Sequence, residues 1–332
     1  MSDKETFEKY LINEFYDDFR EGLITRRTFV RRVAFITGSM AATITALSVA
    51  GCSPAELPTP TEPMPEPGTS TPAAAAGATG SPSPAPTTGP RSPLSVAEGD
   101  PAVVAGPVTF SSQGAEITGY LARPADAGAA PAPAILICHE NRGLTPHIQD
   151  VARRFAKAGY VALAIDLLAR EGGTASRDYD EVPGLLTNAG PERHVGDFKA
   201  GYDYLQAQDF VDGERIGMTG FCFGGGITWR CAAALPGLKA AVPFYGPAPD
   251  AADVPKIKAA VLGMYAEQDE RITGGMADLD KALTAAGVTH QMNVYPGVNH
   301  AFHNDTGQRY NEAQATQAWN DMLAWFQAHM AA

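Results

Sequence analysis

The sequence predicts an α/β domain over residues 100–332, in which helices cover both faces of a mostly parallel central sheet. Strand-like and helix-like segments alternate along this part of the chain, which is typical of parallel sheets with crossover helices. Two inner segments, 134–138 and 160–165, are apolar at every position. Central parallel strands have this composition because both of their faces are buried.

The remaining elements follow from the same alternation. Strands are predicted at 104–111, 116–122, 133–139, 160–166, 215–219, 239–244, 258–265 and 289–295. Helices are predicted at 147–158, 192–208, 224–235, 274–286 and 310–328. The chain carries a formal net charge of −12. Because protein surfaces that bind the negatively charged nucleic acids are basic, this charge argues against nucleic acid as a partner.

The most specific motif is the segment 220–224, which reads GFCFG and lies between a predicted strand and a predicted helix. This is the glycine spacing of a nucleophile elbow, G-x-Nuc-x-G, with Cys222 at the centre. The chain must turn sharply there, and a Cβ at Gly220 or Gly224 would collide across the turn. The helix that follows directs free amides at the sulfur and favours a thiolate. The alternative is a glycine-rich turn around a buried structural cysteine.

An acid and a histidine follow the elbow in the order that α/β-hydrolases require. Asp269 lies in the loop after the strand 258–265, and His300 lies in the loop after the strand 289–295. The carboxyl ends of parallel strands meet at one edge of the sheet, so Cys222, Asp269 and His300 are expected close together. Asp269 is also a candidate helix cap, and Glu267 or Asp278 compete for its role. The sequence thus predicts an α/β-hydrolase fold with a catalytic triad.

The same fold predicts where an oxyanion would bind. The donors are the backbone amides of Phe223, after the nucleophile, and Asn141, in the loop after the strand 133–139. The spacing of His300 and His303 could suggest a metal, but no established metal motif accompanies it, so no metal is expected. Cys138 and Cys231 are interpreted as core residues without a disulfide. His147, His194, His290 and His329 are assigned to polar faces, and His303 to the pocket rim or its loop.

Five segments together resemble one known family, the dienelactone hydrolases. They are GFCFGG (220–225), ICHEN (137–141), DLLAR (166–170), EQD (267–269) and PGVNHAF (296–302). The similarity extends over roughly residues 104 to 330. It implies an α/β-hydrolase that cleaves a carboxylic ester or lactone through a thioester, without metal or organic cofactor.

The resemblance also assigns residues. Cys222 matches the nucleophile, His300 the general base and Asp269 the acid that orients it. Glu140 matches the glutamate that holds the resting thiol, and Arg170 matches an arginine that contacts the substrate carboxylate. The oligomeric state is not indicated.

Two positions depart from the family pattern. Asn304 stands where members that act on dienelactone typically have a second arginine, and Ala301 stands where serine is frequent. An amide cannot replace the bidentate charge recognition of arginine. Acyl transfer does not require that arginine, but dienelactone itself becomes a less expected substrate.

The first part of the sequence predicts export. Residues 25–31 (TRRTFVR) are close to the twin-arginine pattern, and a moderately apolar run at 33–50 follows. Residues 49–52 (VAGC) then resemble a lipobox, so Cys52 is the expected lipidation site. Residues 1–52 are interpreted as a twin-arginine signal with a lipobox, which makes the protein a membrane-tethered exported lipoprotein. The alternatives are an uncleaved anchor and a chance Arg-Arg pair.

Residues 53–99 are rich in Pro, Ala and Thr and cannot bury a core, so they are predicted to form a disordered linker. The leader at 1–24 shows a helix-like apolar spacing at Phe7, Tyr10, Leu11 and Phe15, to which the sequence assigns no role. Two rival functions stay open. One is a thiol redox or sensing lipoprotein, and the other is a non-catalytic binding module on a hydrolase scaffold.

Overall fold

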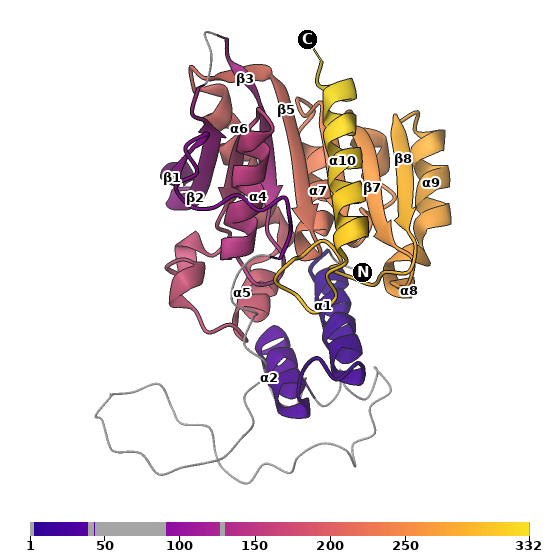
Figure 1. Ribbon diagram of the computed structural model, residues 1–332. Coiled ribbons are helices and arrows are strands. Elements are labelled where there is room, and N and C mark those ends of the chain that lie inside the picture. The colour runs from indigo at the N-terminus through magenta and orange to yellow at the C-terminus, as the bar shows by residue number, and fades with distance from the viewer. Residues whose placement is uncertain (1–2, 39–42, 44–90, 127–129, 332) are drawn as a thin grey trace, which may run out of the picture.

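An eight-stranded sheet with the order β1-β2-β4-β3-β5-β6-β7-β8 forms the centre of the protein (Figure 1). The computed structural model describes residues 3–38, 43, 91–126 and 130–331. The strands are β1 (Val103–Ser112), β2 (Ala115–Pro124), β3 (Ala132–Cys138), β4 (Val161–Ile165), β5 (Val211–Phe221), β6 (Ala240–Phe244), β7 (Ala260–Ala266) and β8 (His290–Tyr295). Every predicted strand is present, and the predicted α/β-hydrolase fold is confirmed.

The sheet is antiparallel only at one edge. β1 pairs with β2 and β2 pairs with β4 in antiparallel register, whereas all pairs from β4 to β8 are parallel. Gln113 and Gly114 join β1 to β2 with φ angles of 49° and 76°. Two successive positive φ angles are the geometry of a two-residue hairpin turn, which matches the twist of the flanking strands.

Helices cover both faces of the sheet, as predicted. α4 (Pro146–Lys157) and α10 (Glu312–His329) share one face, where Phe155 contacts Phe326 at a ring-centroid distance of 6.1 Å (Figure 1). α6 (Pro191–Gln206) and α7 (Phe223–Ala234) cover the other face. α9 (Met276–Ala285) packs beside β8. The strands β3 and β4 are almost completely buried between these layers.

Within the part of the chain that the structure describes, four further α-helices were not predicted as elements. α1 (Asp3–Arg20) and α2 (Arg26–Thr37) lie at the edge of the sheet where the parallel strands end (Figure 1). α5 (Val182–Ala189) contacts both of them, and α8 (Glu270–Thr273) follows β7. The described residues also form three short 3-10 helices, η2 (Ala169–Glu171), η3 (Thr174–Ser176) and η4 (Val254–Lys256). Residues 3–24 of the leader are therefore part of the folded protein.

Residues 91–99, which the sequence analysis places in the linker, pack against the domain. The Ser92 amide and the Ser95 hydroxyl each donate to Asp305 Oδ2 at 3.1 Å, and Val96 is buried. Arg154 adds an ion pair to the same buried carboxylate at 2.9 Å. These bonds explain why residues 91–99 belong with the domain, since the buried Asp305 carboxylate needs donors that this segment supplies.

The predicted lipidation site, Cys52, and the residues 53–90 of the predicted linker lie outside the described residues. Among the helices of the described ranges, none combines the length and the apolar character needed to cross a membrane. The export signal and the lipid anchor therefore stay predictions.

Candidate active site

Cys222 occupies the sharp turn between β5 and α7. Its φ and ψ angles are 59° and −120°, a conformation that costs free energy for a residue with a Cβ. The turn depends on its glycines. A Cβ on Gly224 would lie 2.5 Å from the carbonyl oxygens of Cys138 and His139, which is too close for any rearrangement short of moving backbone. The strand-turn-helix context that defines an elbow is therefore present.

The Cys222 thiol is kept neutral in this structure. Its residue is 2% exposed, and burial raises the pKa of the thiol well above its ordinary value. The carboxylates of Glu14 and Glu140 raise this pKa further, whereas the Phe223 amide, in the first turn of α7, acts in the opposite direction. A neutral thiol is a weak nucleophile, so the site as folded disfavours attack.

Asp269 and His300 meet at the same edge of the sheet. Asp269 Oδ2 lies 2.6 Å from His300 Nδ1, and both residues are buried. Burial by itself would raise the pKa of Asp269, but the neighbouring His300 and Arg271 outweigh it and hold this pKa below its usual range. A ring nitrogen of His300 lies within 4.8 Å of Cys222 Sγ. The three side chains predicted from the sequence are thus brought together.

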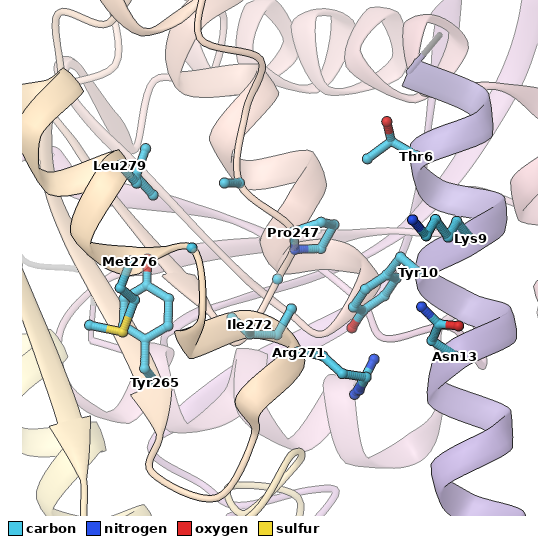
Figure 2. A pocket seen from close by; sticks show the side chains of 13 residues that line it. Thr6, Lys9, Tyr10, Asn13, Pro247, Tyr265, Arg271, Ile272, Met276 and Leu279 are labelled. Carbon is cyan, nitrogen blue, oxygen red and sulfur yellow. The ribbon is translucent and has the colours of Figure 1, made fainter. Parts of the chain in front are cut away.

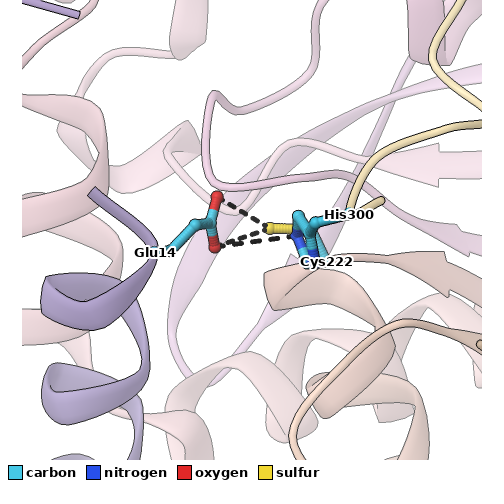
Figure 3. Close-up of side chains that lie close together, drawn as sticks. All are labelled: Glu14, Cys222 and His300. Carbon is cyan, nitrogen blue, oxygen red and sulfur yellow. Dashed lines mark hydrogen bonds and ion pairs between the residues drawn. The ribbon is translucent and has the colours of Figure 1, made fainter. Parts of the chain in front are cut away.

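A carboxylate from the leader contacts the nucleophile. Cys222 Sγ donates to Glu14 of α1, with distances of 3.3 Å to Oε2 and 3.6 Å to Oε1 (Figure 3). Asn141 Nδ2 donates to Glu14 Oε1 at 2.8 Å, and His300 Nε2 lies 3.8 Å from Oε2. Burial works against the negative charge, but His300 and Arg271 lower the pKa of Glu14 on balance. Glu14 therefore stays an anion beside the thiol.

Tyr10, one turn before Glu14, is the second leader residue at the site. Its hydroxyl lies 3.4 Å from both Cys222 Sγ and His300 Nε2. The sequence analysis assigned neither residue to the site. The apolar spacing of the leader was the available signal, because residues i and i+4 share a helix face and Glu14 follows Tyr10 by four.

Glu140 does not hold the thiol here as the resemblance implies. It follows β3, and its Oε2 accepts a hydrogen bond from Asn304 Nδ2 at 2.6 Å. Burial raises the pKa of Glu140, although His147 and His300 partly compensate. The physical reason for the difference is that α1 places the Glu14 carboxylate against the sulfur. Asn304, which replaces the family's arginine, binds this glutamate.

Arg170 is engaged away from the nucleophile. Its Nη1 forms an ion pair of 2.5 Å with buried Asp197, and its Nη2 donates to the Ser112 carbonyl at 2.9 Å. It is not among the described residues that line the cavity at Cys222. Because both of its terminal nitrogens already have acceptors, the expected contact with a substrate carboxylate finds no support in this arrangement.

Residues of α1 line two cavities close to Cys222 and His300. One of about 220 Å³ is lined by Glu14, Cys222 and His300 together with Arg142 and Arg309. The other, of about 230 Å³, is lined by Tyr10 of α1, by Arg271 and by the apolar side chains of Pro247, Ile272, Met276 and Leu279 (Figure 2). Both cavities have leader residues in their walls, so the shape of the site depends on α1.

The remaining histidines correct part of the sequence interpretation. His147 and His194 are buried rather than on polar faces, and His303 is a buried core residue that stacks on Phe221 at 4.9 Å. His147 pairs with Asp305 at 2.8 Å, which supplies the partner that its burial requires. Glu14, Cys222 and His300 form a donor set that could hold a metal ion, so the expected absence of a metal stays a prediction.

Comparison with known proteins agrees with the motifs. The family model described as "Dienelactone hydrolase family" matches residues 117–330. This chain belongs to the dienelactone hydrolase family. A provisionally named carboxymethylenebutenolidase of Methylorubrum extorquens is 36% identical over 243 residues, which are 68% of this chain and 82% of that protein. One from Salmonella typhi is 35% identical over 254 residues, which are 71% of this chain and 92% of that protein.

The crystal structure of a provisionally named dienelactone hydrolase from Klebsiella pneumoniae has the same fold. It superimposes with a TM-score of 0.63 at 34% identity and covers 68% of this chain and 98% of that one. The resemblance stated from the motifs is thereby confirmed at the level of the family, and the protein is a hydrolase of this family. The family match begins at residue 117, so α1 and α2 precede it.

Proposed function

We propose that the protein hydrolyses a carboxylic ester or lactone through a triad of Cys222, His300 and Asp269. The observation that carries this proposal is the 2.6 Å contact between His300 and Asp269, with Cys222 beside them on a strained elbow. A base oriented by a buried acid next to a nucleophile is the arrangement that acyl transfer requires. Family membership supports the same reaction class.

The chemistry proceeds in two halves. His300 takes the thiol proton, and the Cys222 sulfur bonds to the acyl carbon while the carbonyl oxygen becomes an oxyanion. The backbone amides of Asn141 and Phe223 are the proposed donors to that oxyanion, each worth about 100- to 1000-fold in rate in comparable sites. Collapse breaks the carbon–oxygen bond, and the leaving alkoxide takes the proton from His300.

Water completes the second half. His300 removes a proton from water, whose oxygen attacks the thioester carbon through a second oxyanion. The carbon–sulfur bond then breaks, the thiolate regains its proton from His300, and a carboxylic acid leaves. Asp269 stabilises the protonated imidazole in both halves and fixes its tautomer. The charge of Glu140 also acts on the Cys222 thiol, so Glu140 is the proposed second carboxylate that influences its deprotonation.

Trapping the intermediate tests this mechanism. The full chain is mixed briefly with p-nitrophenyl acetate, quenched in acid and digested, and the peptide that contains Cys222 is weighed. An acetyl group on Cys222 and its loss in Cys222→Ala, together with loss of turnover, are the expected results. Turnover that survives in Cys222→Ala would refute covalent catalysis. Oxidation of the thiol without acylation would favour the redox alternative.

We further propose that the protein is exported by the twin-arginine route and anchored through Cys52. The support is the ordered succession of the Arg26-Arg27 pair, an apolar run and the lipobox. Changing both arginines to lysine should leave precursor in the cytoplasm, because a receptor reads this pair. Cys52→Ala should abolish labelling by a fatty-acid probe. Label that persists in Cys52→Ala would contradict the anchor, and export that survives the lysine changes would contradict the route.

A further inference from the structure

The leader helix α1 is amphipathic, and its apolar face is buried on the hydrolase domain. Phe7, Leu11 and Phe15 recur at helical spacing and are 1%, 0% and 0% exposed. The Phe7 ring lies 5.0 Å from that of Phe223, the residue directly after the nucleophile. This face therefore covers the elbow itself rather than a remote surface.

Charges on α1 complement charges on the domain. Asp17 pairs with Arg271 at 2.8 Å, and Asp18 pairs with Arg309 at 2.9 Å. Near the start of the helix, Asp3 pairs with Arg230 at 2.7 Å. Ion pairs along the length of the helix fix its register on the domain, so that Tyr10 and Glu14 arrive at the chemistry.

The polar residues of α1 fill the space that a substrate needs. A reacting carbonyl carbon must approach a sulfur to within roughly 3–3.5 Å. Glu14 Oε2 already lies 3.3 Å from Cys222 Sγ, and Glu14 Oε1 also binds the Asn141 side chain. Tyr10 at the same time engages His300 Nε2, the nitrogen that must accept the thiol proton. An ester cannot reach the nucleophile while α1 is docked, so turnover by the full chain comes from the fraction of molecules in which α1 is displaced.

We propose that α1 is an intramolecular inhibitor that keeps the hydrolase latent until the leader is displaced or removed. The Glu14 carboxylate takes the place of the reacting acyl group, and Tyr10 holds the base. This inference rests on the proposed hydrolase function for its biological meaning, but the blocking of Cys222 is a separate physical claim. The proposal gives the leader, to which the sequence assigned no role, the role of an inhibitor.

The link to α2 couples inhibition to the twin-arginine segment. Arg26 and Arg27 open α2, which is held on the domain by Arg32 to Asp180 at 2.8 Å and by Asn188 Nδ2 to the Phe35 carbonyl at 3.2 Å. A protein that binds the pair Arg26-Arg27 would displace α2, to which α1 is joined by a short connection. Latency would thus end when the leader is engaged or lost.

Alkylation of Cys222 tests the block without reference to ester chemistry. Full-length wild type is compared with a variant that carries Leu11→Asp and Phe15→Asp, which makes docking of α1 unfavourable. Iodoacetamide labelling at Cys222, followed by peptide mass spectrometry, should accelerate at least about tenfold, the ratio that corresponds to about 1.4 kcal/mol. Lys4→Asp on the exposed face of α1 is the matched control and should change the rate by less than about twofold.

A second variant avoids the apolar contacts altogether. Asp17→Arg with Asp18→Arg reverses two charges that are not fully buried, so repulsion from Arg271 and Arg309 should release α1 without loss of core packing. Its labelling rate should also rise, and the rise should diminish at high salt because the charges are screened. Cooperative thermal unfolding confirms that each variant is folded.

The outcomes separate this inference from the proposed function. Faster labelling and faster ester hydrolysis in both released variants support the inhibitor and the hydrolase together. Faster labelling without ester turnover in any protein supports the block and contradicts the hydrolase proposal. Labelling that is equal to or slower than that of wild type in both folded variants overturns the inhibitor, because α1 then does not shield Cys222.

Discussion

Replacement of Asp269 by asparagine tests the triad most directly. The variant keeps the size of the side chain but loses the charge that faces His300 Nδ1 at 2.6 Å within a buried site. A hydrogen bond to a charged group contributes about 1.5–3 kcal/mol. Since about 1.4 kcal/mol is a factor of ten, kcat/KM should fall roughly ten- to two-hundredfold. A neutral ester such as p-nitrophenyl acetate is the substrate, so that charge recognition does not enter.

Two neighbouring acids that compete for this role serve as controls. Glu267 is exposed and accepts a hydrogen bond from the Gly297 amide at 2.8 Å, and Asp278 pairs with Lys281 at the surface. Glu267→Gln and Asp278→Asn should each change kcat/KM by no more than about twofold. The reasoning fails if either control loses as much as Asp269→Asn, or if Asp269→Asn retains full activity in a folded protein.

Three further outcomes follow from the structure. Gly224→Ala should lower the urea-unfolding free energy by roughly 1–3 kcal/mol, whereas Gly275→Ala, whose Cβ meets no atom within 4 Å, should not; equal stabilities would contradict the elbow argument. Burial lowers the pKa of His194 to about 4. In the unfolded chain histidine has a pKa of about 6.5, so the unfolded state takes up this proton first. The free energy of unfolding should therefore fall by about 3 kcal/mol as the pH decreases from about 6.5 to about 4. His194→Gln should remove that part of the decline in chemical denaturation across pH, and an unchanged decline would contradict it. Arg170→Ala should lower the thermal stability and affect neutral and anionic esters alike; a selective rise of KM for anionic esters would restore the family role.

The hydrolase domain could be predicted from the sequence because its signals are local. Unbroken apolar runs identify β3 and β4. The elbow requires glycine at positions 220 and 224, because the turn leaves no space for a Cβ at either position. The order of Cys222, Asp269 and His300 then follows from strands that end at one edge. The three side chains meet because the loops after β5, β7 and β8 lie at the same edge of a parallel sheet.

The contribution of the leader could not be predicted in the same way. Periodicity at Phe7, Tyr10, Leu11 and Phe15 reveals an apolar helix face but carries no information on the surface that the face covers. Docking of α1 depends on ion pairs with residues more than two hundred positions away, such as Asp18 with Arg309. The same limit explains the shift in the role of Glu140, because the competing carboxylate of Glu14 reaches the thiol only through tertiary packing.

The buried histidines show a related limit. A histidine in a helix is usually interpreted as a surface residue, yet His147 is tolerated inside because Asp305 Oδ1 accepts a hydrogen bond from its Nδ1. Arg170 likewise matches a family position, but its guanidinium is paired with Asp197, an acid that the motif does not include. Partners that are distant in sequence decide whether a polar side chain serves structure or substrate.

The Asp305 carboxylate decides how far the chain can be shortened from its N-terminus without disturbing the hydrolase domain. It lies five residues after His300, and the Ser92 amide and the Ser95 hydroxyl are two of its donors. A shortened chain that starts at residue 100 would keep the proposed triad of Cys222, Asp269 and His300 yet remove those donors from a buried anion, which would loosen the loop that carries His300. A fragment that starts before Arg91 retains the hydrogen bonds from Ser92 and Ser95 to Asp305. The boundary for isolating the hydrolase domain is thus set by the partners of a single carboxylate and not by the composition of the linker.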